Sequence, residues 1–278
     1  GLNGNRTHIK IPCPSYLEAA DREGFVLWID FPSWFNLTST TTESARKQMR
    51  EWIARDFNHP SIIAWSLINE EWGLDMRNEA MRRFLKMWWE EVKLLDPTRF
   101  VVDNSPAGGN HVISDFADQH AYFAIPEQRS RAEEWIEKFS TSREERFPWP
   151  ESEHAGGEPL IWSEMGDWGH PDIERLRAFY AGWDPYWFDQ GNYGGPIAGG
   201  IDRFFELGLD GVYGGLSGFA RAAQLHQEQA LRHQLTYVRR FPTIAGYVIT
   251  QFTDLNSESN GLMDMTRGKK VFHERLAE

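Results

Sequence analysis

Short apolar strands alternate with amphipathic helices along the chain, and this alternation most constrains its fold. Strands are predicted at residues 2–9, 25–31, 61–68, 99–103, 115–122, 159–163 and 244–252. Helices are predicted at residues 15–23, 42–56, 78–95 and 131–139, with several more within 171–240, the last of them over 220–240. Repeated strand–helix units favour a parallel sheet with right-handed crossovers.

Seven strands are one fewer than the eight of a closed (β/α)8 barrel. The sequence therefore predicts an α/β chain built as a TIM barrel that lacks its first strand and helix. The alternative is an open, doubly wound sheet. A nucleotide-binding sheet of that kind would carry a Gly-rich phosphate loop after its first strand, and the sequence has none there.

The composition argues against several classes of partner. The net charge is −12 and no run of Lys or Arg stands out, so nucleic-acid binding is not expected. No apolar run is long enough to predict a membrane span. The single cysteine, Cys13, cannot form an internal disulfide, so the redox compartment stays open. Aromatic residues make up 14% of the chain, which suits either stacking on sugars or a Trp-rich core.

Acidic residues directly follow two of the predicted strands. Asn69-Glu70-Glu71 comes after residues 61–68, and Glu164 comes after residues 159–163. In a parallel barrel, catalytic groups project from the carboxyl ends of the strands. A retaining glycosidase needs two carboxyl groups about 5–5.5 Å apart, one to attack the anomeric carbon and one to protonate the leaving oxygen. One such acid alone is more often a loop residue or a helix cap, but two on one barrel are more specific.

Both of these acidic segments can be compared with the motifs of a known family. Residues 58–70 read Asn-His-Pro-Ser-Ile-Ile-Ala-Trp-Ser-Leu-Ile-Asn-Glu, which resembles the signature of glycoside hydrolase family 2. That family includes β-galactosidases, β-glucuronidases and β-mannosidases. The resemblance implies that Glu70 is the general acid/base and that Asn69 contacts the sugar 2-hydroxyl. Residues 160–166, Leu-Ile-Trp-Ser-Glu-Met-Gly, resemble the family's nucleophile strand, which makes Glu164 the nucleophile.

Three weaker matches support the resemblance. Residues 3–8, Asn-Gly-Asn-Arg-Thr-His, resemble a compressed form of the second-strand motif, which implies that Arg6 and His8 line the pocket. His120 and Tyr122 match a position on the sixth strand, where the family tyrosine hydrogen-bonds the nucleophile. Residues 246–262 resemble the last strand of one branch of the family, except that Thr250 stands where many members have Trp.

The sequence also departs from the family. The first barrel strand and the preceding β-sandwich domains have no counterpart, so we expect a single catalytic barrel domain over residues 1–278, incomplete at its N-terminus and part of a longer polypeptide. Residues 30–34 replace the metal-binding Glu and His of some β-galactosidases, so we expect no metal or other cofactor. The Asn-x-Lys element of β-glucuronidases is not evident, although Arg267, Lys269 and Lys270 lie near its place.

Other candidates have two interpretations. Asp30 and Asn104 end strands, where either a sugar contact or a structural hydrogen bond would fit. Trp72 and Trp168 follow strand ends and are placed to stack on sugars. The histidines offer a metal hypothesis, but their spacing fits no standard zinc pattern. They are His8, His59, His111 and His120.

We therefore predict a retaining β-glycosidase that hydrolyses a terminal β-linked sugar through a covalent glycosyl-enzyme. Its expected partner is a carbohydrate, and an oligomer is compatible with the sequence. One alternative is an endo-acting glycanase of a related barrel family, and another is a catalytically inactive carbohydrate-binding barrel. The sugar, the linkage, exo or endo action, the oligomeric state and the localisation are left open.

Overall fold

The computed structural model describes residues 2–108, 110–182, 200–255 and 258–275. Its contacts divide the chain into two compact units. Unit 1 comprises Gly1–Ala121, Glu137–Ser163 and Pro242–Val248. Unit 2 comprises Tyr122–Ile136, Glu164–Phe241 and Ile249–Glu278. The expectation of a single barrel domain over residues 1–278 stays a prediction.

Unit 1 contains a four-stranded parallel sheet of order β1-β2-β3-β4. Its strands are β1 (Gly4–Thr7), β2 (Val26–Asp30), β3 (Ile62–Ser66) and β4 (Phe100–Val102). The register aligns Asp30 of β2 with Ser66 of β3, and Ser66 with Val102 of β4. Parallel strands in this register bring their carboxyl ends to one edge of the sheet. That edge carries the polar residues predicted for the site.

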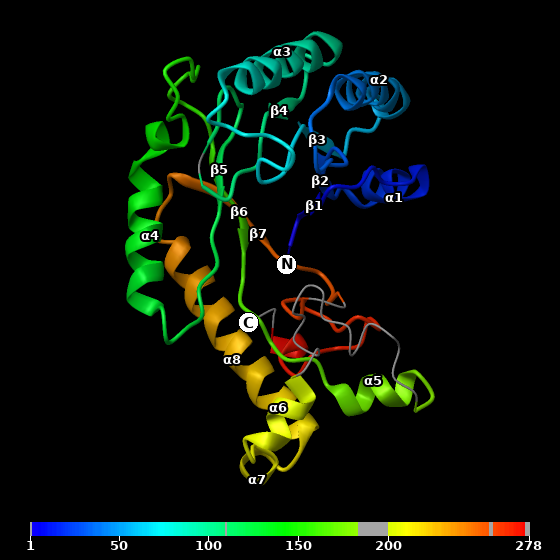
Figure 1. Ribbon diagram of the computed structural model, residues 1–278, viewed down its shortest axis with the longest axis vertical. Helices are drawn as coiled ribbons and strands as arrows, with labels where there is room; N and C mark the ends of the chain where they lie inside the picture. Colours follow the sequence, from blue (N-terminus) through cyan, green and yellow to red (C-terminus); the bar gives the residue numbers. More distant parts are fainter. Residues whose placement is uncertain (1, 109, 183–199, 256–257, 276–278) are drawn as a thin grey trace. The chain divides into compact units, whose positions relative to one another are not determined.

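Three helices return the chain between these strands (Figure 1). They are α1 (Pro14–Glu23), α2 (Ser39–Asp56) and α3 (Glu79–Leu95). Gly24 ends α1 with a left-handed φ of 67°, which glycine adopts at little cost. Thr38 begins α2 with a capping box, and the Asn78 side chain caps α3 by accepting from the Ala80 amide. The inward faces of the helices and the buried faces of β2 and β3 form the main core of unit 1.

Large aromatic side chains fill that core. The Trp65 ring packs edge-on against Trp52 at 4.8 Å, and Phe31 packs edge-on against Trp88 at 5.4 Å. Trp65 is fully buried, and so is Trp162. The Trp28 side chain is 5% exposed. These three tryptophans, each within a strand, therefore belong to the buried interior.

A second sheet has the order β5-β6-β7. Its strands are β5 (Ala117–His120), β6 (Leu160–Met165) and β7 (Ile244–Ile249). The unit boundary follows Ser163 within β6 and Val248 within β7. Between β5 and β6 the chain forms α4 (Arg129–Thr141) and a 3-10 turn, η1 (Arg143–Arg146). The polar segment at residues 148–158 is a loop.

Unit 2 is mostly helical, and its longest helix is α8 (Leu216–Val238). Before it come α5 (Ile173–Phe179), α6 (Gly200–Glu206) and α7 (Asp210–Tyr213), and a 3-10 turn, η2 (His273–Arg275), lies near the end of the chain. One apolar cluster joins Ile173 and Leu176 of α5 to Phe204 of α6 and Leu216 of α8. A second joins α8 to the C-terminal loops through Leu231, Leu262 and Phe272.

All seven predicted strands are present, and the predicted helices are present with changed ends. The largest change is at α8, which begins at Leu216, four residues before its predicted start. The Gly214-Gly215 pair, with φ of 72° and 116°, provides the break that lets the helix start there. Among the described residues, we find no helix with both the length and the apolar character needed to cross a bilayer.

Candidate functional site

The turn after β3 carries Asn69, Glu70 and Glu71 in unit 1. Asn69 forms an isolated parallel bridge with Ser105, and the Glu70 amide donates to the Ser105 carbonyl at 2.9 Å. Glu70 and Glu71 have φ values of 48° and 56°. This left-handed region is rare for residues other than glycine, and each such residue costs roughly 1–3 kcal/mol. Two strained residues in a row mark the turn as a candidate functional site.

Asn104 holds this turn from the end of β4. Its side-chain oxygen accepts from the Glu71 amide at 3.0 Å, and its side-chain nitrogen donates to Glu71 Oε1 at 3.0 Å. Asn110 donates to the same Glu71 oxygen at 3.0 Å. Asn104 is fully buried. For Asn104, these contacts favour the structural hydrogen bond over the sugar contact.

His120, at the end of β5, binds the Glu70 carboxyl group. Its Nδ1 lies 2.8 Å from Glu70 Oε1. The side chain of His120 is 2% exposed, whereas that of Glu70 is 30% exposed. The acid therefore reaches solvent while its imidazole partner is enclosed.

Arg6 of β1 ties several strand ends together. Its Nη2 donates to Asn69 Oδ1 at 2.7 Å and lies 2.7 Å from Asp30 Oδ2, and its Nη1 donates to the Ser163 carbonyl at 3.5 Å. Its guanidinium lies 5.1 Å from the centre of the Trp28 ring. Because Arg6 occupies Asn69 Oδ1, the amide orientation is fixed and Nδ2 is left as a buried donor with no partner among the described residues. An unpartnered buried donor is uncommon in proteins and marks Asn69 as a candidate functional residue.

Asp30 is buried beneath this arginine. Burial raises the pKa of the Asp30 carboxyl, an effect that the charges of Arg6 and His8 oppose. The bond to Arg6 supports the structural interpretation of Asp30. His8 Nδ1 lies 4.0 Å from Asp30 Oδ2, and the His8 side chain is 49% exposed.

An aromatic surface lies beside the Glu70 turn in unit 1. The His8 ring packs edge-on against Trp72 at 6.0 Å, and Trp72 stacks on Phe35 at 6.3 Å with 14° between the planes. Phe35 is 84% exposed. Trp72 was predicted from its place after a strand, whereas Phe35 was not, because an exposed loop phenylalanine has no periodicity to mark it.

Unit 2 contains the other predicted acid. The Tyr122 hydroxyl donates to Glu164 Oε2 at 2.5 Å, which confirms the hydrogen bond implied by the family resemblance. Glu164 is 9% exposed. The Trp168 ring packs on Tyr122 at 5.1 Å and is 45% exposed. A hydrogen bond from a phenol to a carboxylate is charge-assisted.

Buried glutamines of α8 hold the loops around Glu164. Gln234 donates to the Phe123 carbonyl at 3.1 Å and to the Gly166 carbonyl at 3.5 Å. Gln224 donates to the His170 carbonyl at 3.1 Å. The loops that carry Tyr122 and Glu164 are thus fixed to one face of the same helix.

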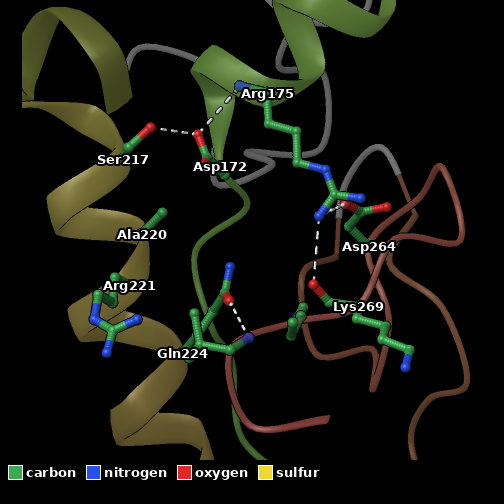
Figure 2. A pocket seen from close by; sticks show the side chains of 10 residues that line it. Asp172, Arg175, Ser217, Ala220, Arg221, Gln224, Asp264 and Lys269 are labelled. Carbon is green, nitrogen blue, oxygen red and sulfur yellow. Dashed lines mark hydrogen bonds and ion pairs between the residues drawn. The ribbon is translucent and has the colours of Figure 1, made fainter. Parts of the chain in front are cut away.

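A separate pocket in unit 2 is lined by charged residues from α5, α8 and the C-terminal loops (Figure 2). Two of its cations are paired: Arg175 lies 3.3 Å from Asp264, which also lines the pocket, and the buried Lys270 lies 2.8 Å from Asp254, which does not line it. Burial raises the pKa of Asp254 to about 6 despite the neighbouring lysine. Neither Glu70 nor Glu164 lines this pocket, and its satisfied ion pairs indicate a structural role.

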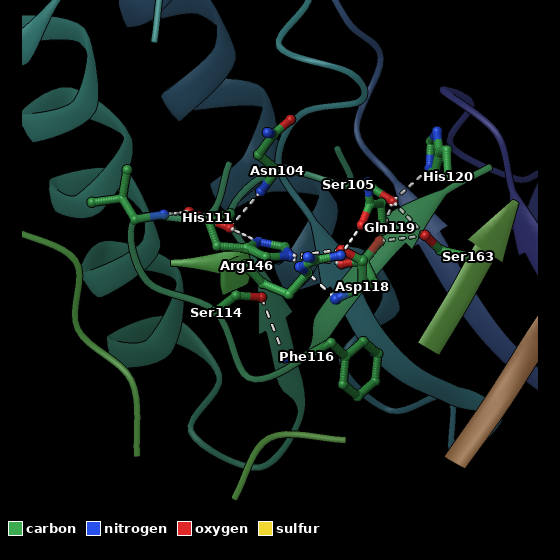
Figure 3. Close-up of polar contacts among 12 residues, drawn as sticks. Asn104, Ser105, His111, Ser114, Phe116, Asp118, Gln119, His120, Arg146 and Ser163 are labelled. Atoms are coloured by element: carbon green, nitrogen blue, oxygen red, sulfur yellow. Dashed lines mark hydrogen bonds and ion pairs between the residues drawn. The ribbon is translucent and has the colours of Figure 1, made fainter. Parts of the chain in front are cut away.

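A buried polar cluster in unit 1 was missed by sequence reasoning (Figure 3). It includes Ser105, His111, Asp118 and Ser163, all fully buried. The sequence could have indicated only that Asp118 lies beside His120, because residues two apart in a strand point to the same face of the sheet. No spacing rule connects them to His111 or Ser105, which follow other elements.

The comparison with protein families decides the chain's classification. A model described as "Glycosyl hydrolases family 2, TIM barrel domain" matches residues 17–167, more than half of the chain. The chain belongs to glycosyl hydrolase family 2. The resemblance seen in the sequence is thereby confirmed. The residue roles within this family-2 chain remain proposals.

Relatives in the family include glycosidases of several names. The chain is 29% identical over 151 residues to a β-galactosidase of Bacteroides ovatus, a match that covers 41% of this chain and 18% of the relative. It is 27% identical over 171 residues to a β-glucuronidase of Paenibacillus borealis, covering 54% of this chain and 27% of the relative. The family-2 chain thus matches only a minor part of each of these proteins.

Solved structures show the fold. A β-D-glucuronidase of Dictyoglomus thermophilum superposes with a TM-score of 0.64 at 18% identity, covering 99% of this chain and 43% of that one. A β-glucuronidase of Bacteroides uniformis, covalently bound to cyclophellitol-6-carboxylate aziridine, gives 0.65 at 18% identity, with 98% and 30% covered. These likenesses confirm the predicted α/β TIM-barrel class.

Proposed function

We propose that this family-2 chain carries the active site of a retaining β-glycosidase, with Glu164 as nucleophile and Glu70 as general acid/base. The observation that carries the proposal is a pair of contacts, one made by the last residue of β5 and one made just after this strand. His120 binds Glu70 in unit 1, and Tyr122 binds Glu164 in unit 2. Only one residue separates His120 from Tyr122 in the sequence. One short segment thus contacts both acids that a double displacement requires.

In the proposed mechanism, a Glu164 oxygen attacks the anomeric carbon while the glycosidic C–O bond breaks. The electron pair of that bond goes to the leaving oxygen, which takes a proton from Glu70. A water molecule then attacks the anomeric carbon, gives its proton to Glu70 and releases Glu164. The Tyr122 hydroxyl would hold Glu164 ionised for the first step and stabilise it again as it leaves.

The remaining predicted residues would bind and orient the sugar. The free Nδ2 of Asn69 would donate to a sugar hydroxyl, and Arg6 would hold Asn69 in place from below. Trp72 and Trp168 would stack on apolar sugar faces, and His8 would contact the substrate from the exposed rim. Asp30 and Asn104 would support these groups through the hydrogen bonds already described.

The substrate is proposed from the relatives. They are named β-galactosidases and β-glucuronidases, so a terminal β-galactoside or β-glucuronide is the first choice. A panel of nitrophenyl β-glycosides, assayed with the full-length protein, would identify the sugar. Cleavage confined to internal bonds of a polysaccharide would instead indicate an endo-acting glycanase.

Trapping of the covalent intermediate tests the assignment of the acids. A 2-deoxy-2-fluoro glycoside of the preferred sugar should inactivate the enzyme and add one glycosyl mass to the peptide that contains Glu164. Glu164→Gln and Glu70→Gln should each lower turnover by several orders of magnitude. Azide should restore turnover to a Glu70→Ala variant by attacking the glycosyl-enzyme without base assistance.

Two results would contradict this proposal. A glycosyl label on any residue other than Glu164 would show that Glu164 is not the nucleophile. Unchanged turnover in either glutamine variant would show that the substituted residue has no part in the mechanism. Binding of sugar without turnover or labelling would indicate an inactive carbohydrate-binding barrel. Glu71→Gln is the matched control, because Glu71 adjoins Glu70 but bonds to the amides of Asn104 and Asn110.

A further inference from the structure

His120, the partner of Glu70, begins a chain of buried hydrogen bonds that leads further into unit 1. Figure 3 shows this chain from His120 onward. The four side chains that continue it are fully buried. They are Ser105, Asp118, His111 and Asp103. A polar network with no solvent access must satisfy its own donors and acceptors, so the position of each proton is constrained.

The far end of the network is an ion triad. Asp103 Oδ1 lies 2.7 Å from His111 Nδ1, and Asp103 Oδ2 accepts from the Val112 and Ile113 amides at 2.7 and 3.1 Å. On the other side, His111 Nε2 lies 3.2 Å from Asp118 Oδ1. Two buried carboxylates flanking one imidazole favour the cationic imidazole, because its charge offsets theirs.

A neutral His111 is the alternative, because the Asp118 amide also lies 3.2 Å from Nε2 and could donate to it. In that case Asp118 Oδ1 would be a buried carboxylate oxygen without a donor, since no other partner is found for it among the described residues. An imidazolium instead places a positive charge 3.2 Å from this oxygen, and its Nε2–H has the Asp118 backbone carbonyl as an acceptor at 3.3 Å. Burial would lower the pKa of His111, but the charges of Asp103 and Asp118 outweigh it and raise the pKa to about 10.

The near end of the network is set by Asp118. Its Oδ2 accepts from the hydroxyls of Ser105 and Ser163 at 2.6 and 2.5 Å. Ser105 has one hydroxyl hydrogen, and it donates this hydrogen to the charged Asp118 carboxylate. Ser105 Oγ can then only accept from His120 Nε2, which lies 3.0 Å away. His120 Nε2 must therefore carry a hydrogen.

Arg6 is the competing neighbour of this nitrogen. Its Nη1 lies 3.5 Å from His120 Nε2 and can only donate. The two 2.7 Å contacts of this guanidinium, to Asp30 and Asn69, are made by Nη2, and Nη1 also has the Ser163 carbonyl as an acceptor at 3.5 Å. The Nη1 contact to Nε2 is 0.5 Å longer than the 3.0 Å contact of Ser105 Oγ. The closer Ser105 oxygen therefore determines the tautomer of His120.

We propose that the Asp103–His111–Asp118 triad acts through Ser105 to hold His120 in its Nε2–H form, so that one proton is kept between His120 Nδ1 and Glu70 Oε1. With Nε2 protonated, the 2.8 Å contact requires a second proton between the two groups. Either a protonated Glu70 carboxyl donates a hydrogen bond to Nδ1, or Nδ1 carries the proton as an imidazolium and donates to the Glu70 carboxylate. The opposite tautomer would carry its hydrogen on Nδ1 and leave Glu70 as a bare carboxylate. These four side chains are positioning residues that keep the general acid loaded.

This inference rests on the proposed function of Glu70. In the reaction, the proton held between His120 and Glu70 passes to the leaving oxygen as the bond between that oxygen and the anomeric carbon breaks. When water later attacks, its proton returns to the pair. The network itself neither gains nor loses a proton. Its effect should therefore fall on substrates that need protonation of the leaving group, and not on those that leave unaided.

The dependence on the leaving group tests the proposal. Asp118→Asn would present an amide donor to Ser105, which would turn the Ser105 hydroxyl toward His120 and reverse the tautomer. We expect kcat/KM for a phenyl glycoside to fall about 100-fold, near the lower end of general-acid contributions, and that for a 2,4-dinitrophenyl glycoside to change by less than about threefold. Ser105→Ala, which removes only the relay, should show the same pattern more weakly.

Ser114→Ala is the matched control. Ser114 is a buried serine of the same segment whose hydroxyl contacts the Phe116 amide at 3.3 Å. It should leave the ratio of the two substrates unchanged. Equal losses on both substrates in Asp118→Asn and Ser105→Ala would reduce the network to a folding role and overturn the proposal, as would no loss on either. If Asp118→Asn does not fold, Ser105→Ala decides.

A second measurement separates this proposal from the proposed function. The ¹⁵N chemical shifts of His120, assigned with a His120→Gln variant, report which ring nitrogen carries hydrogen in the full-length protein. We expect Nε2–H in the unsubstituted protein and a shift toward Nδ1–H in Asp118→Asn. The Nδ1–H tautomer in both would refute the relay even if Glu70 is the general acid. A wild-type protein without glycosidase activity but with the expected tautomers would refute only the proposed function.

Discussion

The charge of His111 should make the stability of the protein fall at alkaline pH. The folded pKa of His111 is about 10, against an ordinary value of 6.5. A raised pKa stabilises the folded state fully below pH 6.5, where both states bind the proton. That stabilisation is lost as the pH rises from 6.5 toward 10, because only the folded state then holds the proton.

The magnitude follows from the size of the shift. His111, Asp103 and Asp118 are fully buried, so solvent screening does not reduce the interaction. A difference of roughly three and a half pKa units corresponds to on the order of 5 kcal/mol in total, of which about 4 kcal/mol is lost by about pH 9.5. For a domain of this size, about 4 kcal/mol corresponds to a fall in Tm of about 8 °C.

Scanning calorimetry of the full-length protein and its His111→Gln variant between pH 6.5 and about pH 9.5 measures this effect. The variant should melt lower at pH 6.5, because two buried aspartates lose their cation at a cost of about 3–5 kcal/mol. Its Tm should then depend less on pH than that of the unsubstituted protein. His154→Gln, which removes an exposed histidine, should keep the original slope.

Parallel pH profiles for the unsubstituted protein and His111→Gln would refute the reasoning, because His111 would then be neutral in the folded state. Asp103→Asn provides a second reading if the glutamine variant is too unstable to purify. It leaves the imidazole in place with one carboxylate instead of two, so the alkaline loss should shrink without disappearing. An unchanged loss would also contradict the triad.

Two further predictions concern the predicted site. Tyr122→Phe removes the hydrogen bond to Glu164. Because a hydrogen bond to a charged group is worth about 1.5–3 kcal/mol, we expect kcat for the preferred nitrophenyl glycoside to fall about 10- to 100-fold. Unchanged turnover would show that Tyr122 does not assist the nucleophile. Arg6→Lys keeps the charge but cannot bind Asp30 and Asn69 together, so kcat/KM should fall about 10-fold or more with a smaller change in Tm. An Arg6→Lys variant with full activity would show that the orientation of Asn69 does not matter.

Local sequence pattern was sufficient for most of the fold. Strands such as β2 and helices such as α3 have strong periodicity and recognisable ends, and each was located to within a few residues. The start of α8 was placed at Ala220 because its apolar periodicity is clearest from there. The Gly214-Gly215 break that begins the helix earlier was visible in the sequence but has no periodic pattern of its own.

Contacts between distant side chains were predicted only where the family motif carried them. The bond between Tyr122 and Glu164 joins residues 42 apart, and only the resemblance indicated it. The sequence left Asp30 undecided between a sugar contact and a structural bond, because its partner Arg6 lies on a different strand. Pairing of this kind depends on the register of β1 and β2, which periodicity does not specify.

The position of Glu70 shows why these long-range contacts matter. Its turn contains two consecutive left-handed residues, and a strained backbone persists only where its surroundings fix it. The Ser105 carbonyl binds the Glu70 amide, while Asn104 binds the Glu71 amide and carboxylate. Ser105 therefore fixes Glu70 twice, through its backbone at the turn and through its hydroxyl toward His120. Because Ser105 makes both of these contacts, it links the position of Glu70 to the protonation of Glu70. Substitutions that loosen this turn should therefore also disturb the proton on Glu70.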